Sequence, residues 1–163
     1  MAKISAGLVV YRRRASHLEV FLVHPGGPFW AKKDAGIWSI PKGEVEPGQD
    51  PLAEAQRELQ EETGCRAGGE FRPLKPVKQA GGKTVHAWAI EGDCDADHIT
   101  SNEFTMEWPP RSGRRQSFPE VDRAGWFDLP TARQKINPAQ TALLDELETL
   151  IAPARPGRKA APA

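Results

Sequence analysis

The chain has 163 residues, of which 39% are apolar and 27% are charged, an ordinary composition for a single globular domain. Basic and acidic residues number 22 each, so the formal net charge is zero and no global charge attracts nucleic acid or an anionic membrane. No apolar stretch reaches the length of a spanning helix, and the N-terminus lacks the pattern of a secretory signal. We therefore expect no membrane partner, no specific nucleic-acid partner, and a monomer or homodimer.

The two cysteines, Cys65 and Cys94, stand in neither a metal-binding nor a redox spacing. Domains that depend on disulfides are usually richer in cysteine. We therefore expect no disulfide scaffold, and a reducing cytoplasm as the location.

The first third of the chain alternates between predicted strands and glycine-rich loops. Residues 3–12 and 18–24 are rich in Val, Leu, Ile and aromatic residues, which indicates two strands. Residues 25–36 contain two prolines and three glycines and are predicted to form a loop. A short strand is expected at 38–40, followed by a second Gly/Pro-rich loop at 41–49.

The clearest helix in the sequence follows that loop. Asp50 is a suitable cap, Pro51 suits the first turn, and Gly64 can end the helix in a left-handed conformation. Apolar and small residues recur at helical spacing and predict a narrow buried stripe, namely Leu52, Ala55, Leu59 and Thr63.

Further strands are expected at about 70–79, 83–90 and 124–128, and helices at 130–136 and 138–151. The last helix carries leucines on one side, at Leu143, Leu144, Leu147 and Leu150. This order of strands, one central helix and C-terminal helices predicts an α/β layered domain.

The organisation is that of one domain with a short tail. Residues 1–151 contain all the predicted elements. Residues 152–163 are rich in proline, alanine and basic residues and cannot bury a core, so we expect a disordered tail there.

The predicted central helix carries glutamates at spacings of three and four, on one face, at Glu54, Glu58, Glu61 and Glu62. Like charges at these spacings destabilise a helix by roughly 0.2–0.5 kcal/mol per pair. Arg57 is the only basic residue of the helix, so most of this charge has no predicted partner within it. A solvated acidic face and a site for a hard cation such as Mg²⁺ or Mn²⁺ are both compatible with the pattern.

The flanking residues favour the cation site. The loop PKGEVEPG at 41–48 is punctuated by glycines, which let the backbone approach a metal or phosphate closely. Gly43 and the segment RELQEETGC at 57–65 stand at the separation found in the Nudix signature. The sequence resembles that signature throughout, except that Gln49 replaces its first glutamate. Arg57, which this glutamate supports in the family, would then use Asp50 or a neutral acceptor.

The resemblance to the Nudix family implies a Nudix-type α/β/α sandwich with a mixed sheet between helices. It implies a Mg²⁺- or Mn²⁺-dependent hydrolase that cleaves a diphosphate linkage in a small nucleotide-like substrate. Glu58 and Glu62 would be the principal metal ligands, Glu61 would bind directly or through water, and the backbone carbonyl of Lys42 would complete the set. Arg57 would orient the carboxylates.

The catalytic base has two candidates by this resemblance. Glu120 stands before the segment Val121-Asp-Arg-Ala-Gly-Trp-Phe, which is similar to a late loop and strand of the family. Glu61, on the signature helix, is the other candidate. A solvent-exposed glutamate at the start of a strand is the plain structural alternative for Glu120.

Substrate-binding candidates lie in the loops, at Lys42, Gly43, Trp30, Lys33, Arg111 and Arg115. Trp88 and Trp126 lie on predicted strands and are expected to be structural. The segment WSIPKG at 38–43 is similar to the dinucleoside polyphosphate hydrolases of the family, although nucleoside triphosphates also remain possible substrates. The alternative function is a catalytically silent Nudix module that binds nucleotides and regulates a partner.

Overall fold

The computed structural model describes residues 3–151. The predicted tail at 152–163 lies outside the described residues. Within residues 3–151, no helix has both the length and the apolar character needed to cross a membrane.

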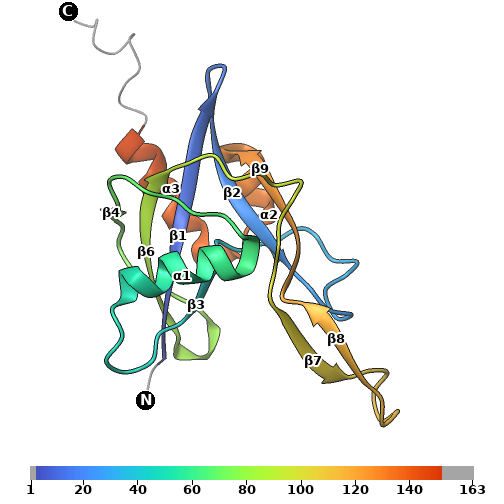
Figure 1. Ribbon diagram of the computed structural model, residues 1–163. Helices are drawn as coiled ribbons and strands as arrows, with labels where there is room; N and C mark the ends of the chain where they lie inside the picture. The colour runs from blue at the N-terminus through green and yellow to red at the C-terminus, as the bar shows by residue number, and fades with distance from the viewer. Residues whose placement is uncertain (1–2, 152–163) are drawn as a thin grey trace, which may run out of the picture.

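A mixed seven-stranded sheet forms the centre of the protein (Figure 1). Its main path runs β4-β6-β1-β2-β9. The long strand β1 (Ile4–Arg14) pairs in parallel with β6 (Thr84–Glu91) and antiparallel with β2 (His17–Pro25). On the other side of β2, the strand β9 (Val121–Asp128) runs antiparallel to it. Three short strands pair with β1 or β6, namely β3 (Lys42–Glu44), β4 (Arg72–Pro73) and β5 (Val77–Lys78).

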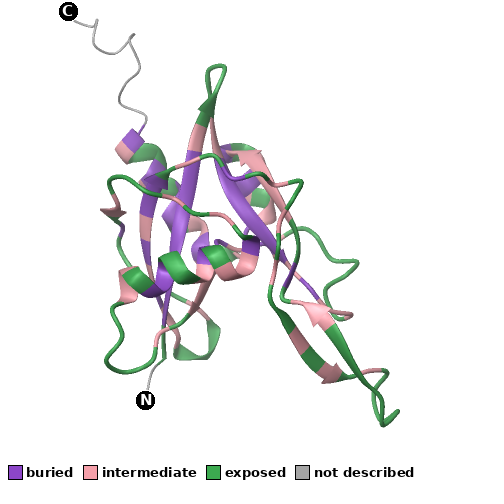
Figure 2. Cartoon of the chain, in the orientation of Figure 1, coloured by how far each residue is buried: buried purple, intermediate pink, exposed green. Residues whose placement is uncertain are grey.

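Helices cover both faces of this sheet. The helix α1 (Pro51–Thr63) packs against one face, and α2 (Leu129–Lys135) and α3 (Thr141–Ile151) pack against the other (Figure 1). Side chains alternate along β1, so that Leu8 faces α1 and Val9 faces α3. The layer arrangement confirms the α/β/α sandwich, and the buried residues concentrate on the sheet and the inner helix faces (Figure 2).

A separate two-stranded ribbon projects from this body (Figure 1). It consists of β7 (Glu103–Glu107) and β8 (Arg115–Pro119), which pair antiparallel. These strands were not expected from the sequence. Phe104 and Met106 alternate with exposed polar residues along β7, and this alternation could have predicted the strand.

Other boundaries also differ from expectation. The loop expected at 41–49 contains β3, and residues 38–40 form only isolated bridges instead of a strand. The strand expected at 70–79 is reduced to two short pieces because prolines 73 and 76 remove donors for the ladder. The helix expected at 138–151 begins with the 3-10 turn η2 (Pro138–Gln140), and another, η1 (Ala80–Gly82), precedes β6.

The two cysteines form a disulfide, which their number and spacing in the sequence did not lead us to expect. Cys65 follows the end of α1, Cys94 lies in the connector after β6, and their Cα atoms are 5.6 Å apart. The pair is separated by 29 residues and meets only because α1 packs across the sheet beside that connector, which no local spacing indicates. The two cysteines therefore give no support to a reducing location.

Candidate functional site

The helix α1 begins and ends where the sequence predicts. The Oδ2 atom of Asp50 accepts a hydrogen bond from the Ala53 N–H at 3.0 Å. At the other end, Gly64 has φ 79° and donates its N–H to the carbonyl of Gln60 at 2.7 Å. The helix buries Ala55, Leu59 and Thr63 of the predicted stripe, together with Glu54, while Leu52 is only half-buried.

Gly43 brings the backbone of β3 against α1. A Cβ atom at this position would stand 2.1 Å from the Cδ and Oε2 atoms of Glu58. Such a separation is too short for any contact, so a side chain here would force the Glu58 carboxylate away from the backbone on which it rests. Lys42 and Gly43 are held in place by their antiparallel register with Gly7 and Ala6 of β1.

Three carboxylates influence one another at this point. The pKa of Glu62 is raised to about 8, chiefly by burial and also by the charges of Glu58 and Glu120, against the opposing effect of Lys42. Burial also raises the pKa of Glu58, with Arg57 acting in the opposite direction. Because the charge of Glu120 raises the pKa values of both Glu58 and Glu62, the site carries an excess of negative charge in the absence of a cation.

Lys42 has a similar position on the basic side. Burial lowers the pKa of its ammonium group, and Lys83 adds to this effect, while Glu62, Glu44 and Glu58 oppose it. The side chain therefore lies near the signature carboxylates, where a phosphate group would also have to lie.

Arg57 binds three carboxylates of its own helix. Its guanidinium donates to Oε1 of Glu54 through Nε at 2.8 Å and through Nη2 at 2.5 Å, and to Oε2 of Glu61 through Nη1 at 2.5 Å. A longer contact of 3.2 Å reaches Glu58. Hydrogen bonds to Glu54 and then Glu61 raise the pKa of Arg57.

This arrangement corrects two expectations. Arg57 uses Glu54 instead of Asp50 or a neutral acceptor, while Gln49 accepts the N–H of Glu46 at 2.8 Å. Glu54 and Arg57 stand three residues apart, the spacing at which helix neighbours meet, so this pair could have been predicted from the sequence. The helix charges are also less isolated than predicted.

The residues present fit a hard divalent cation. Burial, and then repulsion between carboxylates, raises the pKa values of Glu58 and Glu62. Carboxylate oxygens are the donors that Mg²⁺ and Mn²⁺ prefer. Among residues 3–151, no group of three His, Cys, Asp or Glu side chains has already converged into a ligand set. Arg57 accounts for this, because it holds Glu61 and contacts Glu58, so a cation would have to replace the guanidinium as their partner.

Glu120 is the residue that connects β8 to β9. Its N–H donates to the carbonyl of Asn102 at 2.8 Å, and its carbonyl accepts the N–H of Gly26 at 2.9 Å. Its side chain is exposed, and its charge raises the pKa values of both Glu58 and Glu62. The predicted base candidate is thus brought to the signature carboxylates from a distant part of the sequence.

The loop after β2 carries exposed aromatic residues. Phe29 is 58% exposed and Trp30 is 40% exposed. The Lys33 ammonium lies 5.5 Å from the centroid of the Trp30 ring, and Phe29 packs edge to face against Trp108 at 5.3 Å. This loop therefore meets the β7–β8 ribbon.

Arg111 and Arg115 are not brought to α1. Arg111 lies in the turn of the ribbon with φ 59°, and Arg115 is the first residue of β8, opposite Glu107. The ribbon points away from α1 (Figure 1).

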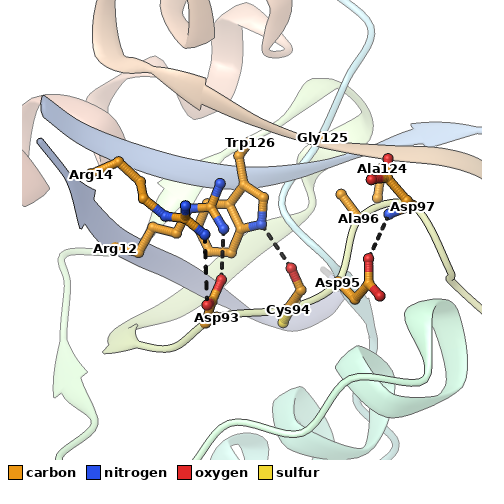
Figure 3. Close-up of a pocket in the computed structure, with 10 residues that line it drawn as sticks. All are labelled: Arg12, Arg14, Asp93, Cys94, Asp95, Ala96, Asp97, Ala124, Gly125 and Trp126. Carbon is orange, nitrogen blue, oxygen red and sulfur yellow. Dashed lines mark hydrogen bonds and ion pairs between the residues drawn. The ribbon is translucent and has the colours of Figure 1, made fainter.

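A hollow with a cavity volume of about 500 Å³ lies on the α1 side of the sheet (Figure 3). The Arg12 guanidinium covers the Trp126 ring at 4.1 Å from its centroid, and the same group donates to Asp93 at 2.6 Å. The Trp126 Nε1 atom donates to the carbonyl of Cys94 at 2.8 Å. Its lining contains none of the predicted site residues, and Trp126 has a packing role there, as expected.

A mixed sheet between helices, with a carboxylate-bearing helix resting on a glycine strand, defines this protein as an α/β domain with a candidate cation centre. The chain matches the family model of the NUDIX domain over residues 1–147. It belongs to the NUDIX family.

Curated relatives share part of the chain. It is 35% identical over 116 residues to the asymmetrical bis(5'-nucleosyl)-tetraphosphatase of Sus scrofa, which covers 63% of this chain and 75% of that protein. It is 32% identical over 101 residues to an octanoyltransferase of Myxococcus xanthus, which covers 62% of this chain but only 25% of that protein. An RNA pyrophosphohydrolase of Bradyrhizobium diazoefficiens is 39% identical over 61 residues, 37% of this chain and 30% of that protein.

Solved structures share the fold. A binary complex of the C. elegans Ap4A hydrolase superposes with a TM-score of 0.65 at 24% identity, covering 93% of this chain and 98% of that one. The NUDIX domain of Shewanella oneidensis NrtR, solved with ADP ribose, superposes with a TM-score of 0.62 at 15% identity, covering 93% and 89%.

Proposed function

We propose that this protein is a metal-dependent pyrophosphohydrolase that cleaves a diphosphate linkage in a nucleotide, with a dinucleoside polyphosphate as the first candidate substrate and a nucleoside triphosphate as the second. The observation that carries the proposal is that the Glu58 carboxylate lies against the backbone of Gly43, while the charge of Glu120 acts on both Glu58 and Glu62. The tetraphosphatase relatives support the choice of substrate.

Glu58 and Glu62 would hold Mg²⁺ or Mn²⁺, with Glu61 and the backbone carbonyl of Lys42 as further ligands. When bound, the cation neutralises charge on the phosphate oxygens. Arg57 would then keep Glu54, to which it donates two hydrogen bonds of 2.5 and 2.8 Å, and would give up Glu58 and any oxygen of Glu61 that binds the cation directly. The ion pairs of Arg57 would thus orient the carboxylates both before and after the cation binds.

Glu120 would act as the general base. An attacking water gives its proton to the carboxylate, its oxygen forms a new bond to phosphorus, and the bond from phosphorus to the bridging oxygen breaks. Glu61 is the second candidate, but both of its oxygens already have donors, Arg57 on one and Asn102 on the other. The exposed carboxylate of Glu120 has more freedom to receive a proton.

Lys42 and the backbone of Gly43 would contact phosphate groups next to the carboxylates, since Lys42 lies close enough for its charge to act on Glu62. Trp30 and Lys33 offer a ring face beside a cation, a combination that suits a base and its phosphate. Arg111 and Arg115, on the ribbon, would reach only the part of a long substrate beyond the linkage that is cleaved. The protein is proposed to act as a monomer or homodimer.

A substrate panel tests this function. Purified protein with Mg²⁺ is incubated with dinucleoside polyphosphates, nucleoside triphosphates, nucleotide sugars and inositol pyrophosphates, and the products are identified by mass. We expect cleavage of a nucleotide substrate that stops on addition of a chelator. If the protein binds nucleotides and cleaves none of them, it is instead the catalytically silent regulatory module.

A further inference from the structure

Asn102, which immediately precedes β7, contacts both candidate bases. Its N–H donates to the backbone carbonyl of Glu61 at 3.0 Å, and its side-chain Nδ2 donates to Oε1 of Glu61 at 3.3 Å. Its own carbonyl accepts the N–H of Glu120 at 2.8 Å. One residue outside the signature helix thus links that helix to Glu120, in the connection between β8 and β9.

The connector that carries Asn102 is fixed to the end of α1. The last carbonyls of a helix have no donors within it, and here the connector supplies them. Thr100 donates its N–H to Thr63 at 3.0 Å, and Asn102 donates to Glu61. The bond from Cys65 to Cys94 ties the same two segments together. The backbone of Asn102 therefore keeps its place relative to the helix whatever its side chain does.

The other end of the linkage is equally defined. The Oγ atom of Ser101 accepts the N–H of Val121 at 3.0 Å and donates to the Asn102 carbonyl at 2.9 Å. Val121 is buried in the core on the α1 side of the sheet. The position of Glu120 relative to Glu61 is thus set through Ser101 and Asn102.

The two oxygens of Glu61 have different partners. Arg57 holds Oε2 at 2.5 Å, and Asn102 holds Oε1. If a cation displaces Arg57, the amide of Asn102 remains as the donor that orients this carboxylate.

We propose that Asn102 is a positioning residue for diphosphate hydrolysis. It holds Glu61 through its side-chain amide and Glu120 through its backbone carbonyl. The inference rests on the proposed function. It assigns Asn102 no contact with the substrate, so its side chain should influence turnover more than substrate binding.

Two variants test this role. Asn102→Ala removes the amide, and Asn102→Asp replaces its donor with a second carboxylate beside Glu61. We expect kcat to fall by about 10- to 100-fold, since a small displacement of a catalytic group has effects of this size. KM should stay within about twofold, because groups that bind ground state and transition state alike are left intact. His98→Ala is the matched control, because it removes one exposed side-chain bond, to Asp95, from the same connector.

A double-mutant cycle measures the bond without using activity. In Asn102→Asp combined with Glu61→Gln, the donor and the acceptor exchange places, so the hydrogen bond can form again. We expect the melting temperature of the double variant to exceed the value that the two single variants predict by addition. Additive melting temperatures would overturn the proposal.

Kinetic results can also overturn it. An Asn102→Ala variant with wild-type kcat, or one that loses no more than His98→Ala, would remove the positioning role while the proposed function stands. A wild-type protein that cleaves no member of the substrate panel would instead overturn the proposed function, and with it the role of Asn102 in hydrolysis.

Discussion

The backbone of Gly43 and the carboxylate of Glu58 are in direct contact, and a Cβ on Gly43 would stand 2.1 Å from Oε2 of Glu58. The contact explains why a glycine is needed at this point of β3. It also fixes the Glu58 carboxylate beside Lys42, whose carbonyl is a proposed metal ligand.

Replacing Gly43 with alanine should displace this carboxylate. We expect Gly43→Ala to lower kcat/KM by about 100-fold, the effect of a misplacement of roughly 1 Å at a catalytic group. Gly68→Ala is the control, because a Cβ at Gly68 meets nothing within 4 Å and its φ is not positive. Turnover and melting temperature of both variants are measured together. Wild-type activity in Gly43→Ala would show that the Glu58 contact has no catalytic importance.

Arg57 should not be replaceable by lysine. A lysine has no planar fork with which to hold Glu54 and Glu61 together. Glu54 is only 9% exposed and would lose its partner. We expect Arg57→Lys to lower the free energy of unfolding by about 1–3 kcal/mol, nearer the lower end because the arginine side chain is 44% exposed. Urea unfolding measures the change, and equal midpoints would contradict this account of the network.

The metal-free protein should lose stability as pH rises. The pKa of Glu62 is about 8 in the folded protein, against 4.5 for an unperturbed glutamate, so the folded form binds the proton more tightly. Its contribution to stability is therefore complete below pH 4.5 and is lost as pH rises through about 8. Because Glu62→Gln removes this titration, the difference in melting temperature between wild type and variant isolates it.

Cation binding should show the opposite trend with pH. A carboxylate must lose its proton to bind a metal, so the Mg²⁺-dependent rise in melting temperature should increase between pH 6 and pH 9. An Mg²⁺ effect that does not change across this interval would contradict the assignment of Glu62 as a ligand.

The general base can be assigned with one variant. If Glu120 takes the proton from the attacking water, Glu120→Gln should lower turnover by ~10²–10⁴ while the Mg²⁺-dependent melting shift stays almost intact. The acid limb of the pH–rate profile should also flatten. A fall of less than about threefold would transfer the role to Glu61.

The signature helix was predictable because its determinants are local. Asp50, Gly64 and the 3.6-residue spacing of the buried positions lie within one short segment, and each has the predicted role. The layered packing of helices against the sheet was predictable from the order of strands and helices along the chain.

What the sequence did not indicate depends on contacts between distant segments. Cys65 meets Cys94 on the α1 side of the sheet, and Asn102 meets Glu61 and Glu120 only after the connector folds over the end of α1. The β7–β8 ribbon has few buried residues, so its periodic signal is weak. Such relationships are set by the tertiary arrangement and leave little trace in local patterns.

The most direct test of a metal-dependent site on α1 is the turnover of Glu62→Gln and Glu58→Gln at saturating Mg²⁺. Each variant keeps the shape of the side chain and removes a charged ligand, and Glu70→Gln, an exposed carboxylate outside α1, is the control. We expect both α1 variants to remain folded and to lose turnover by ~10²–10³ on the preferred nucleotide substrate, with the control unchanged. Turnover near the wild-type value in both α1 variants would contradict the account.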